Sequence, residues 1–333
     1  MDLRRCAREE LLDTRMCDLP LSLDGSWVQP LVERALGELR DRDLRVRPHF
    51  WLADEWFSPE NVPGVALPFY LAHRRLMRLE RDMMLEVEGG TRSECLQLIR
   101  HELGHAMQHA YQLHRRRRWQ QLFGKASEPY PEFYKPRASS RRFVVHLDGW
   151  YAQAHPVEDF AETFAVWLGT SPGKWRSAYR NWPALEKLEY VDELMAEVAG
   201  CAPKVRSKAR PYRLRSLKHT LREHYDRRRE HYAVGYSDQF DRDLLRVFAR
   251  GGKGESAVRF LRRHRRELRE QVSKHTGEHA FTVDQVYKQM IGRCRELELR
   301  CGNSTSTTKL DMALILATHT LYTLHRRGDW HPV

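Results

Sequence analysis

Residues 99–105 read Ile-Arg-His-Glu-Leu-Gly-His, inside a stretch (residues 93–113) whose apolar positions recur at helical spacing. This periodicity predicts a helix, which Thr91 or Ser93 can cap. His101 and His105 are four residues apart and share one helix face, so both imidazoles can bind one metal ion. Glu102 can then reach a water molecule on that ion. The stretch therefore predicts a zinc site with two histidine ligands and a carboxylate base.

A tetrahedral catalytic zinc needs a third protein ligand. Gln108 and Tyr111 stand where the metzincin pattern requires Gly and His, which excludes that pattern. His109 is eight residues beyond the first ligand, or roughly 12 Å along the helix axis, too far to share the ion. Glu158 and Glu162 lie one turn apart in a second predicted helix, so one can bind zinc while the other holds a ligand imidazole.

The two helices together resemble a known family. His-Glu-Leu-Gly-His followed by Glu-Asp-Phe-Ala-Glu-Thr-Phe (residues 158–164) is similar to the gluzincin metallopeptidases, in particular bacterial zinc-binding metallopeptidases whose active core resembles the anthrax lethal factor catalytic domain. The resemblance implies that Glu158 is the third ligand of a single Zn²⁺ ion. It also implies that Glu162 supports a ligand and that Tyr151, seven residues before Glu158, assists catalysis.

The expected activity is hydrolysis of a peptide, or peptide-like amide, bond by zinc-activated water. Zinc lowers the pKa of its water toward about 7, Glu102 takes the proton as general base, and Tyr151 donates to the developing oxyanion. His146 and His155 are alternative donors, although a structural role is the commoner one for such histidines. Asp159 is interpreted as an acid at a helix N-terminus. Thermolysin's Asn-Glu-x-x-Ser-Asp signature is absent, which argues against a thermolysin-type substrate pocket.

The elements around the motif are predicted from composition and periodicity. Short strands and turns are expected over residues 47–70, and half-buried or short strands over residues 84–88 and 143–147. Residues 65–69 and 85–88 are candidates for a sheet edge that pairs with an extended peptide. Further helices are expected at residues 26–40, 158–168, 183–198, 214–232, 238–248, 254–272, 282–299 and 307–324.

The length of 333 residues predicts two domains, or one domain with a large helical appendage. Residues 200–211, which contain two prolines and four basic residues, mark the expected boundary. We predict an α+β fold in which residues 1–203 form a zincin-like core, with a small sheet and the active-site helix. Residues 204–333 are predicted to form an all-α basic domain. The six scattered cysteines, the absence of a signal sequence and the absence of a long apolar run predict a cytoplasmic protein with free thiols and no membrane partner.

The chain carries a net charge of +12, and its basic residues cluster at residues 115–118, 222–229 and 262–266. Basic helices can bind phosphates, but acidic residues at i,i+3 and i,i+4 spacing favour ion pairs on helix surfaces instead. The expected partner is a peptide or protein substrate. Two alternatives remain open: a nucleic-acid-associated zincin guided by the basic helices, and a zinc-binding scaffold without activity. The intact Glu102 argues against the scaffold, which needs ligands but no base.

Overall fold

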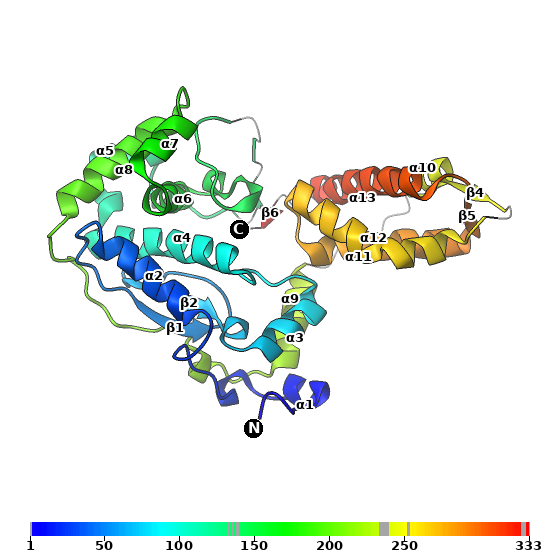
Figure 1. The fold of residues 1–333 in the computed structure, drawn as a ribbon, viewed down its shortest axis with the longest axis horizontal. Coiled ribbons are helices and arrows are strands. Elements are labelled where there is room, and N and C mark those ends of the chain that lie inside the picture. The colour runs from blue at the N-terminus through cyan, green and yellow to red at the C-terminus, as the bar shows by residue number, and fades with distance from the viewer. Residues whose placement is uncertain are drawn as a thin grey trace. The chain divides into compact units, whose positions relative to one another are not determined.

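The computed structural model describes residues 2–131, 133–134, 136–137, 140–232, 240–251, 254–327 and 331–332. By their contacts, residues 1–83 and 87–224 form a first unit, and residues 84–86 and 225–332 form a second. The helices and strands of both units are drawn in Figure 1. A boundary between independently folding domains at residues 203 and 204 stays a prediction.

The first unit is mainly helical. Its helices are α1 (Arg8–Leu12), α2 (Gln29–Arg40), α3 (Arg74–Met84), α4 (Arg92–Tyr111), α5 (Arg117–Phe123), α6 (Pro156–Gly169), α7 (Pro172–Ala178), α8 (Ala184–Val198) and the start of α9 (Leu221–His231), with strands β1 (His49–Ala53), β2 (Gly64–Pro68) and β3 (Phe133–Tyr134). Strands β1 and β2 pair in parallel, from His49 opposite Gly64 to Ala53 opposite Pro68, which confirms the strands predicted within residues 47–70. The chain is mostly helical with a small content of strands, which agrees with the predicted α+β class.

Strand β2 is paired on both sides. All five of its residues are buried, β1 lies on one side, and Ala66 N–H donates to the carbonyl of Phe57 at 2.8 Å on the other. Phe57 therefore bridges to the free side of β2, which is one of the two candidate edges for an extended peptide.

Two predicted strands are wrong. Helix α3 runs to Met84, and the chain then turns through Leu85 and Gly89, which both have positive φ (73° and 69°). Residues 143–147 form no strand, with bends at Phe143 and Leu147, because side chains accept from two of their backbone N–H groups. Val145 N–H donates to Tyr179 Oη at 3.1 Å, and Leu147 N–H donates to Glu162 Oε2 at 2.9 Å.

Helices α4 and α6 pack along each other and carry the predicted site. The predicted cap is confirmed at Thr91, which forms a reciprocal capping box with Glu94. Gly104 allows the close packing, because a Cβ at this position would lie 2.8 Å from the Cα of Ala161 on α6. The motif face of α4 is therefore buried against α6.

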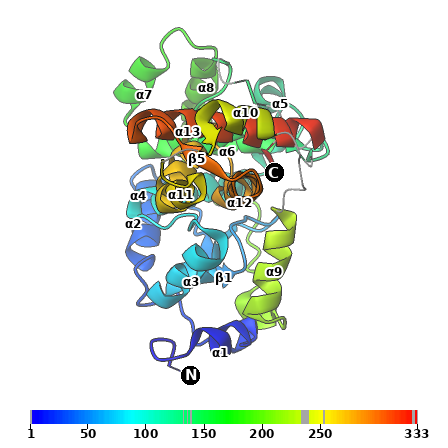
Figure 2. The same cartoon turned by 90° about the vertical axis from the view of Figure 1, so that its right-hand side faces the viewer.

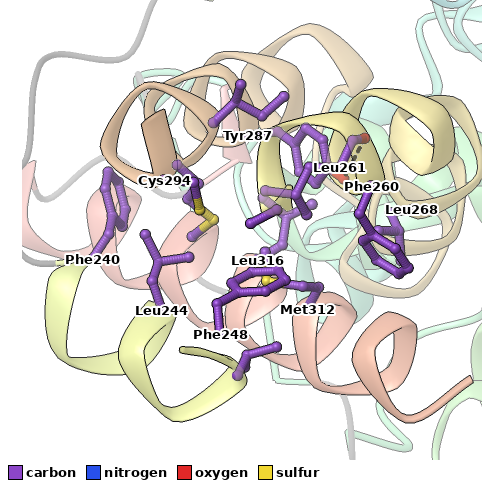
Figure 3. Close-up of a cluster of buried hydrophobic side chains, with 14 of the residues drawn as sticks. Phe240, Leu244, Phe248, Phe260, Leu261, Leu268, Tyr287, Cys294, Met312 and Leu316 are labelled. Carbon is purple, nitrogen blue, oxygen red and sulfur yellow. Dashed lines mark hydrogen bonds between the residues drawn. The ribbon is translucent and has the colours of Figure 1, made fainter. Parts of the chain in front are cut away.

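The second unit packs four helices around one apolar core. Helices α10 (Asp241–Val247), α11 (Ala257–Thr276), α12 (Ala280–Glu296) and α13 (Thr305–Arg327) lie side by side in both views (Figures 1 and 2). Figure 3 shows their core, in which Tyr287 donates from its hydroxyl to the carbonyl of Leu261 at 2.9 Å.

The prediction of an entirely helical tail is wrong in one detail. Strands β4 (Phe248–Arg250) and β5 (Leu299–Cys301) form an antiparallel pair, and a two-residue strand β6 (His331–Pro332) lies near the C-terminus. The predicted start of α10 at Asp238 lies outside the described residues. Among the residues that are described, no helix combines the length and the apolar character needed to cross a bilayer.

Candidate metal centre

Three predicted ligands converge between α4 and α6. His101 Nε2 lies 3.1 Å from His105 Nε2 and 3.0 Å from Glu158 Oε2, and His105 Nε2 lies 3.2 Å from the same oxygen. All three side chains are buried. Zinc bonds of about 2.0 Å in a tetrahedron separate neighbouring ligand atoms by about 3.3 Å. Two imidazoles and one carboxylate at this spacing fit a zinc ion.

Glu162 orients one of these ligands. Its Oε1 lies 2.8 Å from His101 Nδ1, and its Oε2 accepts a hydrogen bond of 2.9 Å from Leu147 N–H. A carboxylate accepts, so His101 Nδ1 carries the proton and Nε2 presents its lone pair to the centre. Glu162 is completely buried. The two glutamates of α6 therefore differ in position as the resemblance implies, with Glu158 at the centre and Glu162 behind His101.

The electrostatics of the centre favour a cation. Burial opposes a charge on His101, but hydrogen bonds and attraction from Glu158 and Glu162 outweigh burial and raise its pKa well above the ordinary value. Burial likewise opposes the charge on Glu158, but His105 and His101 lower its pKa well below the ordinary value. The carboxylates thus stabilise positive charge where the two Nε2 atoms meet, which is the requirement of a metal ion.

Glu102 lies beside the centre with its carboxylate buried. Its Oε2 has no hydrogen-bond partner among the described residues. Burial is the largest cause of its raised pKa, and the neighbouring histidines oppose this shift. Leaving a buried carboxylate oxygen unpaired costs stability. The position therefore suits a group that exchanges a proton with a bound water or substrate.

Tyr151, the predicted oxyanion donor, lies against the centre. Its ring centroid is 5.6 Å from that of His101, and Gly149 and Trp150 immediately before it adopt left-handed φ values of 73° and 54°. Burial, together with the charge of Glu158, raises the pKa of Tyr151 well above its ordinary value, so the hydroxyl keeps its proton. A protonated phenol here can donate a hydrogen bond.

A second tyrosine at the centre was not found from the sequence. Tyr130 donates from its hydroxyl to Glu158 Oε1 and stacks on His155, with ring centroids 4.0 Å apart. It lies in the connection between α5 and α6, which has no periodic pattern that would single out one residue. Tyr130 fixes the oxygen of Glu158 that does not face the histidines.

The alternative donors have structural partners. His146 Nε2 lies 3.0 Å from the carbonyl of Gln97. His155 caps α6 by accepting from Val157 N–H at 3.3 Å, and its Nε2 lies 2.9 Å from the carbonyl of Glu128. These contacts agree with a structural role for both histidines.

Asp159 lies in the first turn of α6, as predicted, and in addition forms a buried ion pair. It is buried and pairs with Lys187 of α8, which also lies 4.3 Å above the ring of Phe143. Burial raises the pKa of Asp159 to about 7, although Lys187 opposes the shift. The pair joins α6 to α8 next to the metal centre.

The centre opens into a cleft of about 740 Å³. One wall is formed by Glu55, Trp56, Phe57, Ser58 and Glu60, and the α4 face continues past His105 through Gln108 and His109. Glu102, Tyr130 and Tyr151 also line the cleft. A substrate in the cleft therefore has access to the three candidate ligands, the carboxylate and both tyrosines.

Comparison with known proteins gives one match. The model of a family described as "Putative zinc-binding metallo-peptidase" matches residues 88–172, which include α4, α6 and every candidate site residue. A search of curated proteins and a search of solved structures each found no match. The family match supports a zinc-binding metallopeptidase, which is a hydrolase.

Proposed function

We propose that this chain is a gluzincin-type metallopeptidase with one zinc ion, held by His101, His105 and Glu158. The observation that carries the proposal is the convergence of three ligand atoms in an open cleft, beside the buried Glu102, whose Oε2 has no hydrogen-bond partner among the described residues. When bound, zinc supplies a water of lowered pKa and polarises the substrate carbonyl. We also propose that the active core is similar to the catalytic domain of lethal factor.

The chain's own residues then divide the remaining work. Glu102 accepts the proton from the attacking water and delivers it to the leaving amine. Tyr151 donates a hydrogen bond to the substrate oxygen as negative charge develops there. Tyr130 and Glu162 hold Glu158 and His101 in place. The activity proposed is hydrolysis of a peptide bond in a peptide or protein substrate.

The test is the metal content of the purified full chain, measured by mass spectrometry. We expect about one zinc per wild-type chain, lost in His105→Ala and Glu158→Ala, because a catalytic zinc site keeps three protein ligands. His231→Ala, an exposed histidine at the end of α9, is the matched control and should keep the metal. A wild-type chain that is folded but does not bind added zinc would contradict the proposed peptidase activity.

The alternative of a nucleic-acid-guided zincin has less support. Members of each basic cluster form ion pairs within their own unit: Arg116 with Glu197, Arg118 with Glu193, Arg222 with Glu9 and Asp13, Arg263 with Glu255, Arg265 with Asp284, and Arg266 with Glu270. Paired guanidinium groups release fewer counterions on binding phosphate. Salt-dependent retention of the chain on DNA would favour this alternative.

A further inference from the structure

The cleft at the metal centre carries a charge opposite to that of the chain. The chain has a net charge of +12, yet the described residues that line the cleft include five glutamates, at positions 55, 60, 88, 102 and 158, and no lysine or arginine. Burial lowers the pKa of His109 to about 3 and also lowers that of His114, so both imidazoles are neutral at pH 7. Apart from the metal ligands, the charges on the described lining are therefore negative.

A second observation points to a ligand for this negative surface. Gln108 lies one turn beyond His105 on the same face of α4 and is only 2% exposed, although it lines the cleft. Its Oε1 has no hydrogen-bond partner among the described residues, and neither has Nδ1 of the neighbouring His109. Burying an amide oxygen without a donor costs stability. A ligand that brings a donor into this part of the cleft would remove that cost.

Glu60, another residue of the cleft lining, supplies a negative charge for such a donor. Glu60 is exposed at the cleft and lies near enough to His114 to influence its pKa. A buried amide oxygen and an exposed carboxylate on the same lining can both accept from an ammonium or guanidinium group. An acidic side chain would meet repulsion from the same surface.

We propose that the cleft selects substrates with a lysine or arginine side chain, which donates to Gln108 and Glu60 one turn of α4 beyond the metal ligands. This inference rests on the proposed function, because it places a peptide in the same cleft. It assigns to Gln108 and Glu60 the choice of substrate and leaves the chemistry of hydrolysis to Glu102.

The test measures binding with peptide hydroxamates, whose hydroxamate group attaches to zinc. Three fluorescent probes differ in one side chain: lysine, norleucine of the same length without charge, or glutamate. Each is titrated into the zinc-loaded full chain by fluorescence polarisation. We expect the lysine probe to bind about tenfold or more tightly than the norleucine probe, since hydrogen bonds to a charged group are among the stronger ones. The glutamate probe should bind most weakly.

Variants of cleft residues test which side chains cause the preference for the lysine probe. Glu60→Gln and Gln108→Leu should each reduce the preference for lysine over norleucine severalfold while retaining zinc. Glu189→Gln, at an exposed glutamate of α8 outside the cleft lining, should leave the preference unchanged. General attraction cannot imitate the result, because a chain with a net charge of +12 attracts the glutamate probe.

Other outcomes overturn the inference in distinguishable ways. Equal binding of the three probes refutes the cationic subsite and leaves the zinc site standing. A lysine preference that survives both cleft variants refutes its assignment to Gln108 and Glu60. If no hydroxamate binds the chain in the presence of zinc, the proposed function fails and the subsite fails with it.

Discussion

Each unit of the chain buries carboxylates, and the cluster around Asp284 compensates its carboxylate differently from the metal centre. In the second unit, Asp284 of α12 is fully buried and accepts from Arg265 Nε at 2.8 Å, from Arg269 at 3.4 Å and from Lys288 at 3.2 Å. In the first unit, Glu158 meets two imidazoles and a phenol, and Glu102 Oε2 has no partner among the described residues.

The difference separates a structural cluster from a candidate catalytic one. Arginine and lysine carry permanent charge, so the aspartate of the second unit is neutralised by the fold itself. An imidazole is charged only while it is protonated, so the glutamates of the first unit are compensated by a proton on His101 or by a metal ion in its place. Burial of a carboxylate is therefore uninformative until its partners are known.

The same substitution of an acid by its amide should give opposite results in the two clusters. Glu102→Gln should reduce hydrolysis by about 10²- to 10⁴-fold, the usual contribution of a general base. Zinc content and the free energy of unfolding should not fall, because a neutral amide is cheaper to bury than a charge. Cleavage of a peptide library followed by mass spectrometry measures the rate. An unchanged rate would exclude Glu102 as the base.

In the second unit, Asp284→Asn should leave hydrolysis unchanged and destabilise the fold by about 3 kcal/mol, because it leaves three cations without their shared partner. Chemical denaturation, with the wild type beside the variant, measures the loss. The pKa of Asp284 is lowered in the folded chain: burial would raise it, but Arg265 and Lys288 outweigh burial. The stabilisation by Asp284 is thus present above pH about 4 and is lost as the pH falls.

The Asp284→Asn variant should lack this sensitivity to acid. A variant as stable as the wild type would contradict the structural role of Asp284.

Zinc itself should distinguish the units. Zinc at 100 times its dissociation constant stabilises the state that binds it by about 2.7 kcal/mol. Hydrogen exchange followed by mass spectrometry should show slower exchange in α4 and α6 on addition of zinc, and no change in α11 and α12. Calcium, which prefers six or more oxygen ligands, is the control ion. Equal protection of both units would mean that the ion does not act through the candidate site.

The sequence could predict the helix of the candidate centre and the face that its two histidines share. Helical periodicity and the cap at Thr91 placed α4, and the four-residue spacing placed His101 and His105 on one face. Spacing alone could not separate Glu158 from Glu162, because both project from the same face of α6. Their distinction came from the family resemblance and is supported by distances that depend on how α6 packs against Gly104.

The misses have a common physical cause. Tyr130 and Lys187 act through contacts with Glu158 and Asp159, 28 residues away in each case, and no local pattern encodes such contacts. The strand predicted at residues 143–147 failed because Glu162 and Tyr179 take backbone donors that a strand would offer to a neighbour. Local propensity does not record which side chain will reach a given backbone group.

The smallest expected effect is a loss of zinc affinity when the contact between Glu162 and His101 is weakened. Glu162→Gln keeps the size of the side chain but weakens its hold on His101 Nδ1, and loss of such support typically lowers metal affinity about 10- to 100-fold. Glu158→Ala should lower it further, because it removes a ligand. Competition with a chromogenic zinc chelator measures both affinities on the full chain.

The control is Glu189→Gln, the same change of glutamate to glutamine at the surface, which should leave the zinc affinity as in the wild type. If Glu162→Gln weakened zinc more than Glu158→Ala, the ligand role would pass to Glu162, and the carboxylate that Tyr130 contacts would be the supporting one.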